Sequence, residues 1–118
     1  MLVGLIRNGA SVIESEIEKI SKAFTRFSDF KWLIVESDST DDTLITLERL
    51  KSSKGISFVS LTTLRSKYPK QTTRLSPCRN VYLKIIFSNE TCKYFDYVAV
   101  LDLDGVNHLL TDKALESC

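Results

Sequence analysis

Hydrophobic positions in this chain alternate between short continuous runs and longer stretches with helical spacing. The continuous runs cover residues 2–6, 30–35, 56–61 and 94–101, and their length is typical of strands buried inside a parallel sheet. In the stretches between them, apolar residues recur every three or four positions, as in an amphipathic helix. The pattern therefore predicts the order β-α-β-α-β-α-β.

The first two helices are predicted over residues 10–28 and from the turn at 36–43 to residues 52–55. In the first, isoleucines and phenylalanines form the buried stripe, and the charged residues, Glu16 among them, occupy the remaining surface. In the second, Ser39 or Thr40 is expected to cap the helix and to put Asp41 and Asp42 in its first turn. Its predicted buried stripe consists of Leu44, Leu47 and Leu50.

Residues 62–76 lack a clear period and contain several basic side chains, which predicts a solvated loop. Pro77 fits best in the first turn of a helix, because its missing N–H costs nothing there, and that helix is expected to end near residue 89. Residues 107–118 carry only a weak helical pattern.

Alternation of strands and helices predicts an α/β fold: a three-layer α/β/α arrangement with a mostly parallel sheet of about four strands and helices on both faces. The chain has 118 residues, so we expect one domain, covering residues 1–118.

Composition narrows the classes of partner. The chain is 43% hydrophobic and 26% charged with a formal net charge of +1, so no overall charge draws it to nucleic acid or anionic membranes. No apolar run approaches the roughly 18 to 20 residues that a membrane span needs, and no signal-peptide pattern is visible. We therefore expect a cytoplasmic or otherwise soluble protein without a membrane span, in which Cys78, Cys92 and Cys118 are free thiols.

The last predicted strand ends in Asp102 and Asp104, followed by Gly105. Ligands of open α/β sheets gather beyond the carboxyl ends of the strands, and hard divalent cations prefer oxygen ligands. The predicted loops after the first two strands would bring Arg7, Glu36 and Asp38 to the same edge. A nucleoside diphosphate with a divalent cation fits this set of side chains.

Three motifs together resemble the nucleotide-sugar-binding half of GT-A-fold glycosyltransferases. They are the string Val35–Thr43 (VESDSTDDT), the helix start Leu75–Asn80 (LSPCRN), and the strand Tyr97–Asp104 (YVAVLDLD). Family two glycosyltransferases and the capsule-type α-1,3-mannosyltransferase relatives show an acidic Ser-Thr-Asp turn, an Arg-Asn helix start and a DxD motif in this order. The resemblance covers residues 2 to about 108.

The resemblance implies that Asp102 and Asp104 form the DxD motif and hold Mn²⁺ or Mg²⁺ against the donor diphosphate. It also implies a nucleotide pocket whose expected residues are Ile6, Arg7, Glu36, Asp38, Arg79 and Asp102. In this pocket the backbone near Ile6 and Arg7 lines the nucleotide, Glu36 or Asp38 contacts the base or ribose, and Arg79 contacts the base or a phosphate.

The implied activity is the transfer of a hexose from a UDP- or GDP-sugar to a glycan or other acceptor. Members of this family carry an acceptor-binding half after the DxD motif, and here only a short stretch follows Asp104. The sequence therefore predicts a donor-binding half that is truncated and inactive alone, with no catalytic residue identified.

Two other functions use the same residues. Leu101–Val106 (LDLDGV) also resembles the DxDG motif of haloacid dehalogenase-type phosphatases, in which the first Asp is the nucleophile and the second a general acid/base. That motif belongs on the first strand of its domain, with further motifs downstream. Alternatively, the chain is a non-catalytic α/β remnant that self-associates or binds a partner lobe through exposed apolar surface.

Overall fold

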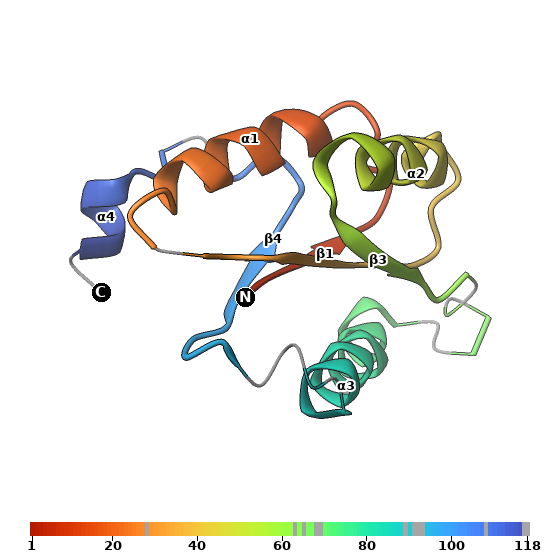
Figure 1. Ribbon diagram of the computed structural model, residues 1–118. Helices are drawn as coiled ribbons and strands as arrows, with labels where there is room; N and C mark the ends of the chain where they lie inside the picture. Colours follow the sequence, from red (N-terminus) through yellow and green to blue (C-terminus); the bar gives the residue numbers. More distant parts are fainter. Residues whose placement is uncertain are drawn as a thin grey trace.

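A four-stranded parallel sheet forms the centre of the computed structural model (Figure 1). The structure describes the chain except Ser28, Thr63, Arg65, Tyr68, Pro69, Asn89, residues 91–93, His108, Ser117 and Cys118, and the side chains of residues 71–75, 112 and 116. Its elements are β1 (Leu2–Ile6), α1 (Ile13–Ala23), β2 (Trp32–Glu36), α2 (Thr43–Lys54), β3 (Ser57–Ser60), α3 (Gln71–Ser88), β4 (Ala99–Asp102) and α4 (Asp112–Glu116). The predicted α/β class and the predicted order of strands and helices are confirmed.

The strands lie in the order β3-β2-β1-β4, and every neighbouring pair is parallel. The register aligns Ile6 with Glu36 and Glu36 with Ser60, while Leu5 aligns with Asp102. The chain moves outward from β1 through β2 to β3 and then returns to the other side of β1. This reversal makes the junction between β1 and β4 the switch point of the sheet.

Helices cover the two faces of the sheet unequally. Helices α1 and α2 lie on one face, and α3 lies on the other beneath the middle of the sheet (Figure 1). The core on the α1 and α2 face is the larger; its buried members are Leu2, Ile6, Ile13, Ile17, Ile20, Ala23, Phe24, Trp32, Ile34, Leu47, Leu50, Ile56 and Leu103. The core beneath α3 has as its buried members Val3, Leu33, Val35, Cys78 and Tyr82.

Helix α1 is shorter than the predicted 10–28 because it begins three residues later and ends at Ala23. Its start is set by Gly9, whose carbonyl accepts hydrogen bonds from the N–H groups of Val12 and Ile13. A side chain at Gly9 would place a Cβ 2.3 Å from Ile6 Cδ1, so any larger residue here would have to displace the Ile6 side chain.

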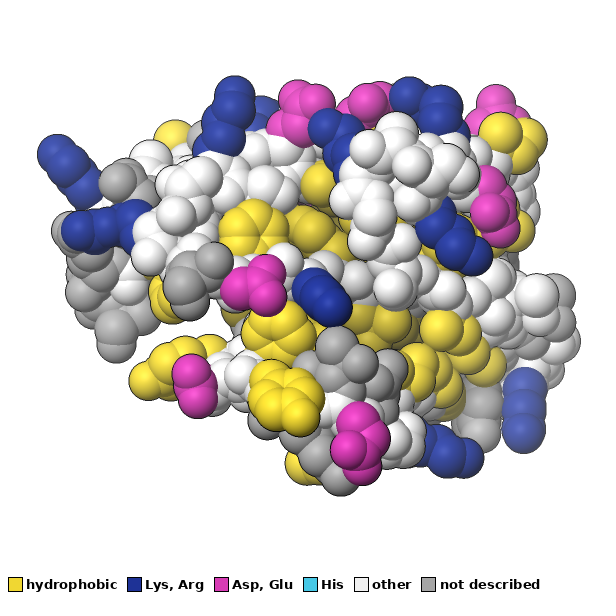
Figure 2. Space-filling view, in the orientation of Figure 1, with side chains coloured by type: hydrophobic (Ala, Val, Ile, Leu, Met, Phe, Trp, Pro, Cys, Tyr) yellow, Lys and Arg dark blue, Asp and Glu magenta, His cyan; other side chains and the backbone are white. Residues whose placement is uncertain are grey.

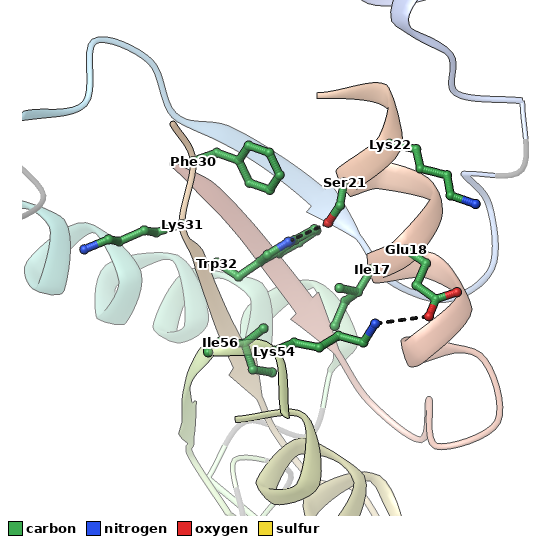
Figure 3. Close-up of a pocket in the computed structure, with 10 residues that line it drawn as sticks. Ile17, Glu18, Ser21, Lys22, Phe30, Lys31, Trp32, Lys54 and Ile56 are labelled. Carbon is green, nitrogen blue, oxygen red and sulfur yellow. Dashed lines mark hydrogen bonds and ion pairs between the residues drawn. The ribbon is translucent and has the colours of Figure 1, made fainter. Parts of the chain in front are cut away.

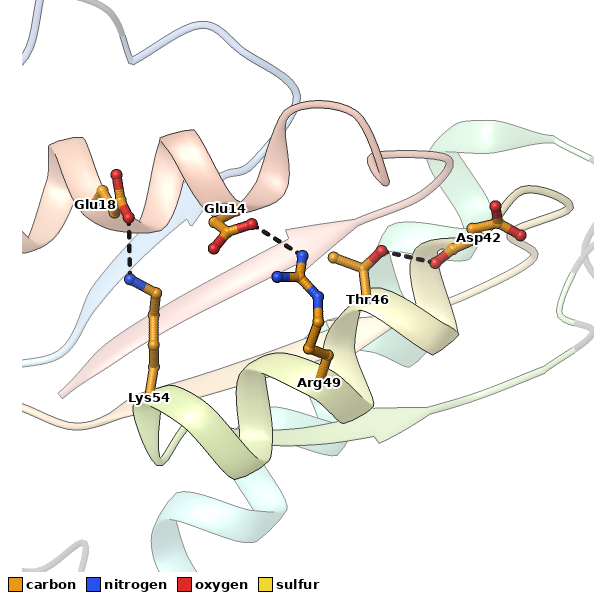
Figure 4. A network of polar contacts seen from close by, with 6 residues as sticks. All are labelled: Glu14, Glu18, Asp42, Thr46, Arg49 and Lys54. Carbon is orange, nitrogen blue, oxygen red and sulfur yellow. Dashed lines mark hydrogen bonds and ion pairs between the residues drawn. The ribbon is translucent and has the colours of Figure 1, made fainter.

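Helix α2 ends as predicted, with Gly55 in the left-handed conformation at φ 65° after Lys54. Its buried stripe differs from the prediction, because Leu44 is exposed and Thr43 is buried with Leu47 and Leu50. Ion pairs connect α2 to α1: Arg49 with Glu14 at 2.9 Å and Lys54 with Glu18 at 3.1 Å (Figure 4).

The predicted basic loop over residues 62–76 is wrong for its last part, because α3 begins at Gln71 and includes Pro77 in its interior. Proline is costly at such a position because it removes a helical hydrogen bond. This cost is offset by packing of the same helix, because Cys78 and Tyr82 are buried against three residues of β1 and β2: Val3, Leu33 and Val35. Of the basic residues in this stretch, Lys67 and Lys70 are exposed, and Arg65 lies outside the described residues.

Strand β4 is half as long as the predicted 94–101. Its pairing begins where Ala99 lies opposite Leu2, and the Ala99 N–H donates to the Met1 carbonyl at 2.9 Å. The residues before it are outside the ladder, although the terminal amine of Met1 donates to the Tyr97 carbonyl at 2.7 Å. Among the described residues, no helix has the length and apolar character to cross a membrane.

Candidate functional site

The acidic pair predicted from the sequence lies beside the switch point of the sheet. Asp102 is the last residue of β4 and is paired with Leu5 near the end of β1. Asp102 and Asp104 are both exposed. Leu103 between them is fully buried, and its N–H donates to the Leu5 carbonyl at 3.2 Å. The buried leucine therefore fixes the two carboxylates at the surface beyond β1.

Close packing against Gly4 holds Leu103 in place. A Cβ built on Gly4 would lie 2.3 Å from Leu103 Cδ1, so the absence of a side chain at Gly4 makes room for the leucine. The bulky side chain and the small residue come from neighbouring strands, β4 and β1. Their fit couples the position of the acidic pair to the centre of the sheet.

The segment after the acidic pair is held by Asn107 and Glu16. The Asn107 side-chain amide donates to the Asp102 carbonyl at 2.5 Å and to Glu16 Oε2 at 2.7 Å, and the Asn107 N–H donates to the same oxygen at 3.3 Å. Glu16 is 1% exposed, so its prediction as a surface residue of the helix is wrong. A buried carboxylate needs partners: Asn107 supplies them to Oε2, and Lys19 Nζ lies 4.0 Å from Oε1.

Hydrogen bonds connect the loop after β1 to the loop after β2. Asn8 N–H donates to Ser39 Oγ at 3.0 Å, and Thr40 N–H donates to Asn8 Oδ1 at 2.7 Å. One residue further, Gly9 N–H donates to Thr43 Oγ1 at 3.0 Å. Ser39 and Thr40 thus bond to the neighbouring loop and do not cap α2 as predicted.

Asp41 supplies the local cap of α2. Its Oδ1 accepts the Thr43 N–H at 3.0 Å and also the Thr43 hydroxyl, while Oδ2 accepts the Ala10 N–H at 3.2 Å. Burial raises the pKa of Asp41, but the hydrogen bonds from Thr43 and Ala10 outweigh it, so the pKa of this carboxyl is below its ordinary value. Asp42 is the residue at the N-cap position.

The first three strands end in the same unusual backbone conformation. Asn8, Asp38 and Thr62 each lie two residues beyond the aligned strand ends and have φ values of 50°, 57° and 51°. Left-handed backbone is rare for residues other than glycine, above all for a β-branched threonine. The Asp38 N–H donates to the Thr62 carbonyl at 2.9 Å, which connects two of these turns.

Glu36 is buried at this edge, with a relative exposure of 1%. Its Oε1 accepts the Ser39 N–H at 2.8 Å, and its Oε2 accepts the Ser60 hydroxyl. Both carboxylate oxygens therefore hold the turns after β2 and β3. Asp38, two residues further, is half-buried at the edge itself.

The other predicted site residues are either the last residue of a strand or lie within two residues of it, whereas Arg79 is exposed on α3. Its neighbour Cys78 is buried and free, and its thiol donates to Ser37 Oγ at 3.8 Å. Burial raises the pKa of the Cys78 thiol, and the nearby charges of Asp38 and Glu36 raise it further. Cys78 is therefore a neutral packing residue, and it brings α3 to the edge that contains Asp38.

The structure thus brings most of the predicted site residues to one edge of the sheet; these are Ile6, Arg7, Glu36, Asp38, Asp102 and Asp104. Within the part of the chain that the structure describes, no three His, Cys, Asp or Glu side chains form a cluster able to hold a metal ion. Asp102 and Asp104 would supply two carboxylate ligands, and further oxygen ligands would have to come from a bound diphosphate and water. His108 lies outside the described residues.

A pocket that the sequence did not predict lies at the opposite end of the sheet. It has a volume of about 520 Å³ and lies between the second halves of α1 and α2, where β2 begins at Trp32. Figure 3 shows Trp32 at its floor, with the indole N–H donating to Ser21 Oγ at 3.2 Å, and Lys31 extending away from it. The lining side chains come from distant segments, so no local motif marks this pocket.

Comparison with known proteins finds no relative of this chain. No family model matches the chain, and neither the curated proteins nor the solved structures contain a match.

Proposed function

We propose that the carboxyl edge of the sheet binds the diphosphate of a nucleotide sugar together with Mn²⁺ or Mg²⁺. In this proposal the chain is the donor-binding half of a GT-A-like glycosyltransferase that transfers a hexose to a glycan or other acceptor. Asp102 and Asp104 hold the cation, whose chemistry is to neutralise charge on the departing nucleoside diphosphate.

The observation that carries this proposal is the order of the strands. Because β4 lies beside β1, Asp102 and Asp104 adjoin Arg7 and Asn8 at the switch point, where open α/β sheets bind their ligands. The motif spacing alone does not decide which strand adjoins β4. The exposure of both carboxylates is also what a ligand that arrives from solvent requires.

The hydrogen bonds at the carboxyl ends of the strands suggest a separate role for each of the remaining residues. Glu36 uses both carboxylate oxygens on Ser39 and Ser60, so we assign it to positioning the loops. Asp38 is then the acid that contacts the base or ribose. Arg7 is exposed directly after β1 and is assigned to the phosphates, with the backbone of Ile6 lining the nucleotide. Arg79 on α3 is assigned to the base or a phosphate.

Isothermal titration with UDP and with GDP, each with and without Mn²⁺, tests the proposal. We expect binding of one nucleotide that requires the cation. Asp102→Asn and Asp104→Asn should each weaken it at least about tenfold, the scale of losing one group that supports a metal. Absence of heat with both nucleotides, in a sample folded by circular dichroism, would refute the proposal.

Asp29→Asn is the matched control, because Asp29 is an exposed acid just before β2, at the other end of the sheet. It should bind nucleotide as the parent chain does. Hydrolysis of p-nitrophenyl phosphate is measured on the same samples. Mg²⁺-dependent turnover that Asp102→Asn abolishes would instead support a phosphatase of the haloacid dehalogenase type.

A further inference from the structure

The two ends of the sheet differ in charge. The acids of the proposed nucleotide site lie at the carboxyl ends of the strands, whereas the pocket at the opposite end is lined by three lysines, Lys22, Lys31 and Lys54, and by one acid, Glu18. Figure 2 shows hydrophobic surface between α1 and the sheet, with Lys and Arg side chains around it. A recess whose lining carries an excess of positive charge favours an anionic ligand.

The ends of the helices do not account for all of this positive charge. Lysine is favoured in the last turn of a helix, and Lys22 and Lys54 occupy such positions in α1 and α2. Lys31 belongs to neither helix, because it directly precedes β2. Its side chain extends away from the pocket (Figure 3), so it adds to the positive potential without filling the space.

Lys54 is the lysine best placed to meet a ligand. Figure 3 shows its side chain extending from the end of α2 to α1, where its amine pairs with Glu18 at 3.1 Å. The Glu18 side chain is 52% exposed, and a solvent-exposed ion pair contributes little to stability. An anionic group that enters the pocket can therefore share the Lys54 amine with Glu18 or replace Glu18 there.

One wall of the pocket is aromatic. Figure 3 shows the rings of Phe30 and Trp32 extending toward α1, and the Trp32 indole N–H donates to Ser21 Oγ at 3.2 Å, which fixes the indole in place. Phe30 is half-buried, so part of its side chain is accessible. Aromatic side chains stack well on other rings. The volume of about 520 Å³ lies in the range of small-molecule sites and has room for a two-ring compound.

We propose that this pocket binds a small aromatic carboxylate. The ring of the ligand packs against Phe30 and Trp32, and its carboxylate pairs with the Lys54 amine. Ile17 and Ile56, both buried, complete the apolar lining. The inference does not depend on the proposed nucleotide site, because the pocket lies at the other end of the sheet and its test uses no nucleotide or metal.

Titration with 2-naphthoate, followed by nuclear magnetic resonance, tests the proposal. The chain has one tryptophan, so the Trp32 indole N–H gives a single resonance that reports on the pocket. We expect 2-naphthoate to shift this resonance, with a dissociation constant of about 1 mM or tighter. 2-Naphthamide has the same rings without the charge and should bind at least about threefold more weakly.

Substitutions at the ion pair should have opposite effects. Lys54→Gln should weaken 2-naphthoate binding about threefold or more and leave 2-naphthamide binding unchanged. Glu18→Gln removes the competing carboxylate and should strengthen 2-naphthoate binding about twofold to fivefold. Lys51→Gln is the matched control, because Lys51 is in the same last turn of α2 but lies over the Phe58 ring. It should leave the binding of both compounds unchanged.

Circular dichroism checks that each variant is folded. An indole resonance that does not move with up to about 10 mM 2-naphthoate would overturn the proposal. Equal affinity for 2-naphthoate and 2-naphthamide would also overturn it, because the ligand would then not be recognised as an anion. Equal weakening by Lys54→Gln and Lys51→Gln would contradict the assignment of the carboxylate to Lys54.

Discussion

The two faces of β4 differ sharply in how they are covered. On the face toward α1, Leu103 is fully buried and Ala99 and Leu101 pack against the same core. On the face toward α3, Val98 and Val100 are 44% and 49% exposed. Helix α3 packs beneath β2, so it covers the middle of the sheet and leaves the side of β4 open. One short strand thus serves as core on one face and as accessible surface on the other.

This difference separates the residues that stabilise the fold from the exposed residues to which we assign binding. The covered face fixes the position of the acidic pair through Leu103, Gly4 and the Glu16–Asn107 contact. The open side leaves Asp102, Val100 and Val98 exposed to solvent. Substitutions on the covered face should therefore change the free energy of unfolding, and substitutions on the open side should change the proposed binding.

The largest expected effect comes from Leu103→Ala. Removal of a fully buried leucine should lower the free energy of unfolding by about 2–5 kcal/mol, measured by urea denaturation. Val100→Ala, on the open face of the same sheet edge, should lower it by less than about 1 kcal/mol. Similar losses for the two variants would show that the faces do not differ in packing.

A smaller effect is expected from Asn107→Ala. The substitution leaves the buried Glu16 carboxylate without the Asn107 amide and should lower the free energy of unfolding by about 1–3 kcal/mol. Glu14→Gln is the comparison, because it removes an exposed ion pair from the same first turn of α1 and should have a smaller effect. A larger loss for Glu14→Gln in the same urea titration would contradict the importance of the Glu16 contact.

The smallest effect is expected from Asp41→Asn, which weakens the cap of α2 and the contact with Ala10. At neutral pH the substitution should lower the free energy of unfolding by about 1 kcal/mol or less. The pKa of Asp41 is lower in the folded chain than in the unfolded chain. Its carboxylate therefore contributes fully to stability above the unfolded pKa of about 3.9, and this contribution is lost as the pH falls through the folded pKa. Between about pH 6 and 3, the melting temperature of Asp41→Asn should fall less than that of the parent chain. Identical pH profiles for parent and variant would contradict this role of Asp41.

Much of the fold follows from local patterns. The apolar run of β1, the isoleucine spacing of α1 and the glycine after α2 correctly predicted these elements, because each signal lies within a few consecutive residues. The same is true of the acidic pair at the end of β4. Helix capping was predicted less well, since Ser39 and Thr40 bond to the loop after β1 while Asp41 provides the cap.

The sequence by itself determined the alternation of strands and helices and the presence of carboxylates at strand ends. The tertiary structure alone decided that β4 lies beside β1, that Glu16 is buried against Asn107, and that α3 begins at Gln71, before Pro77. These features depend on contacts between segments far apart in the chain, and hydrophobic periodicity reports only that a side chain is buried. It does not identify the partner, which is set by how the helices and strands fill space against one another.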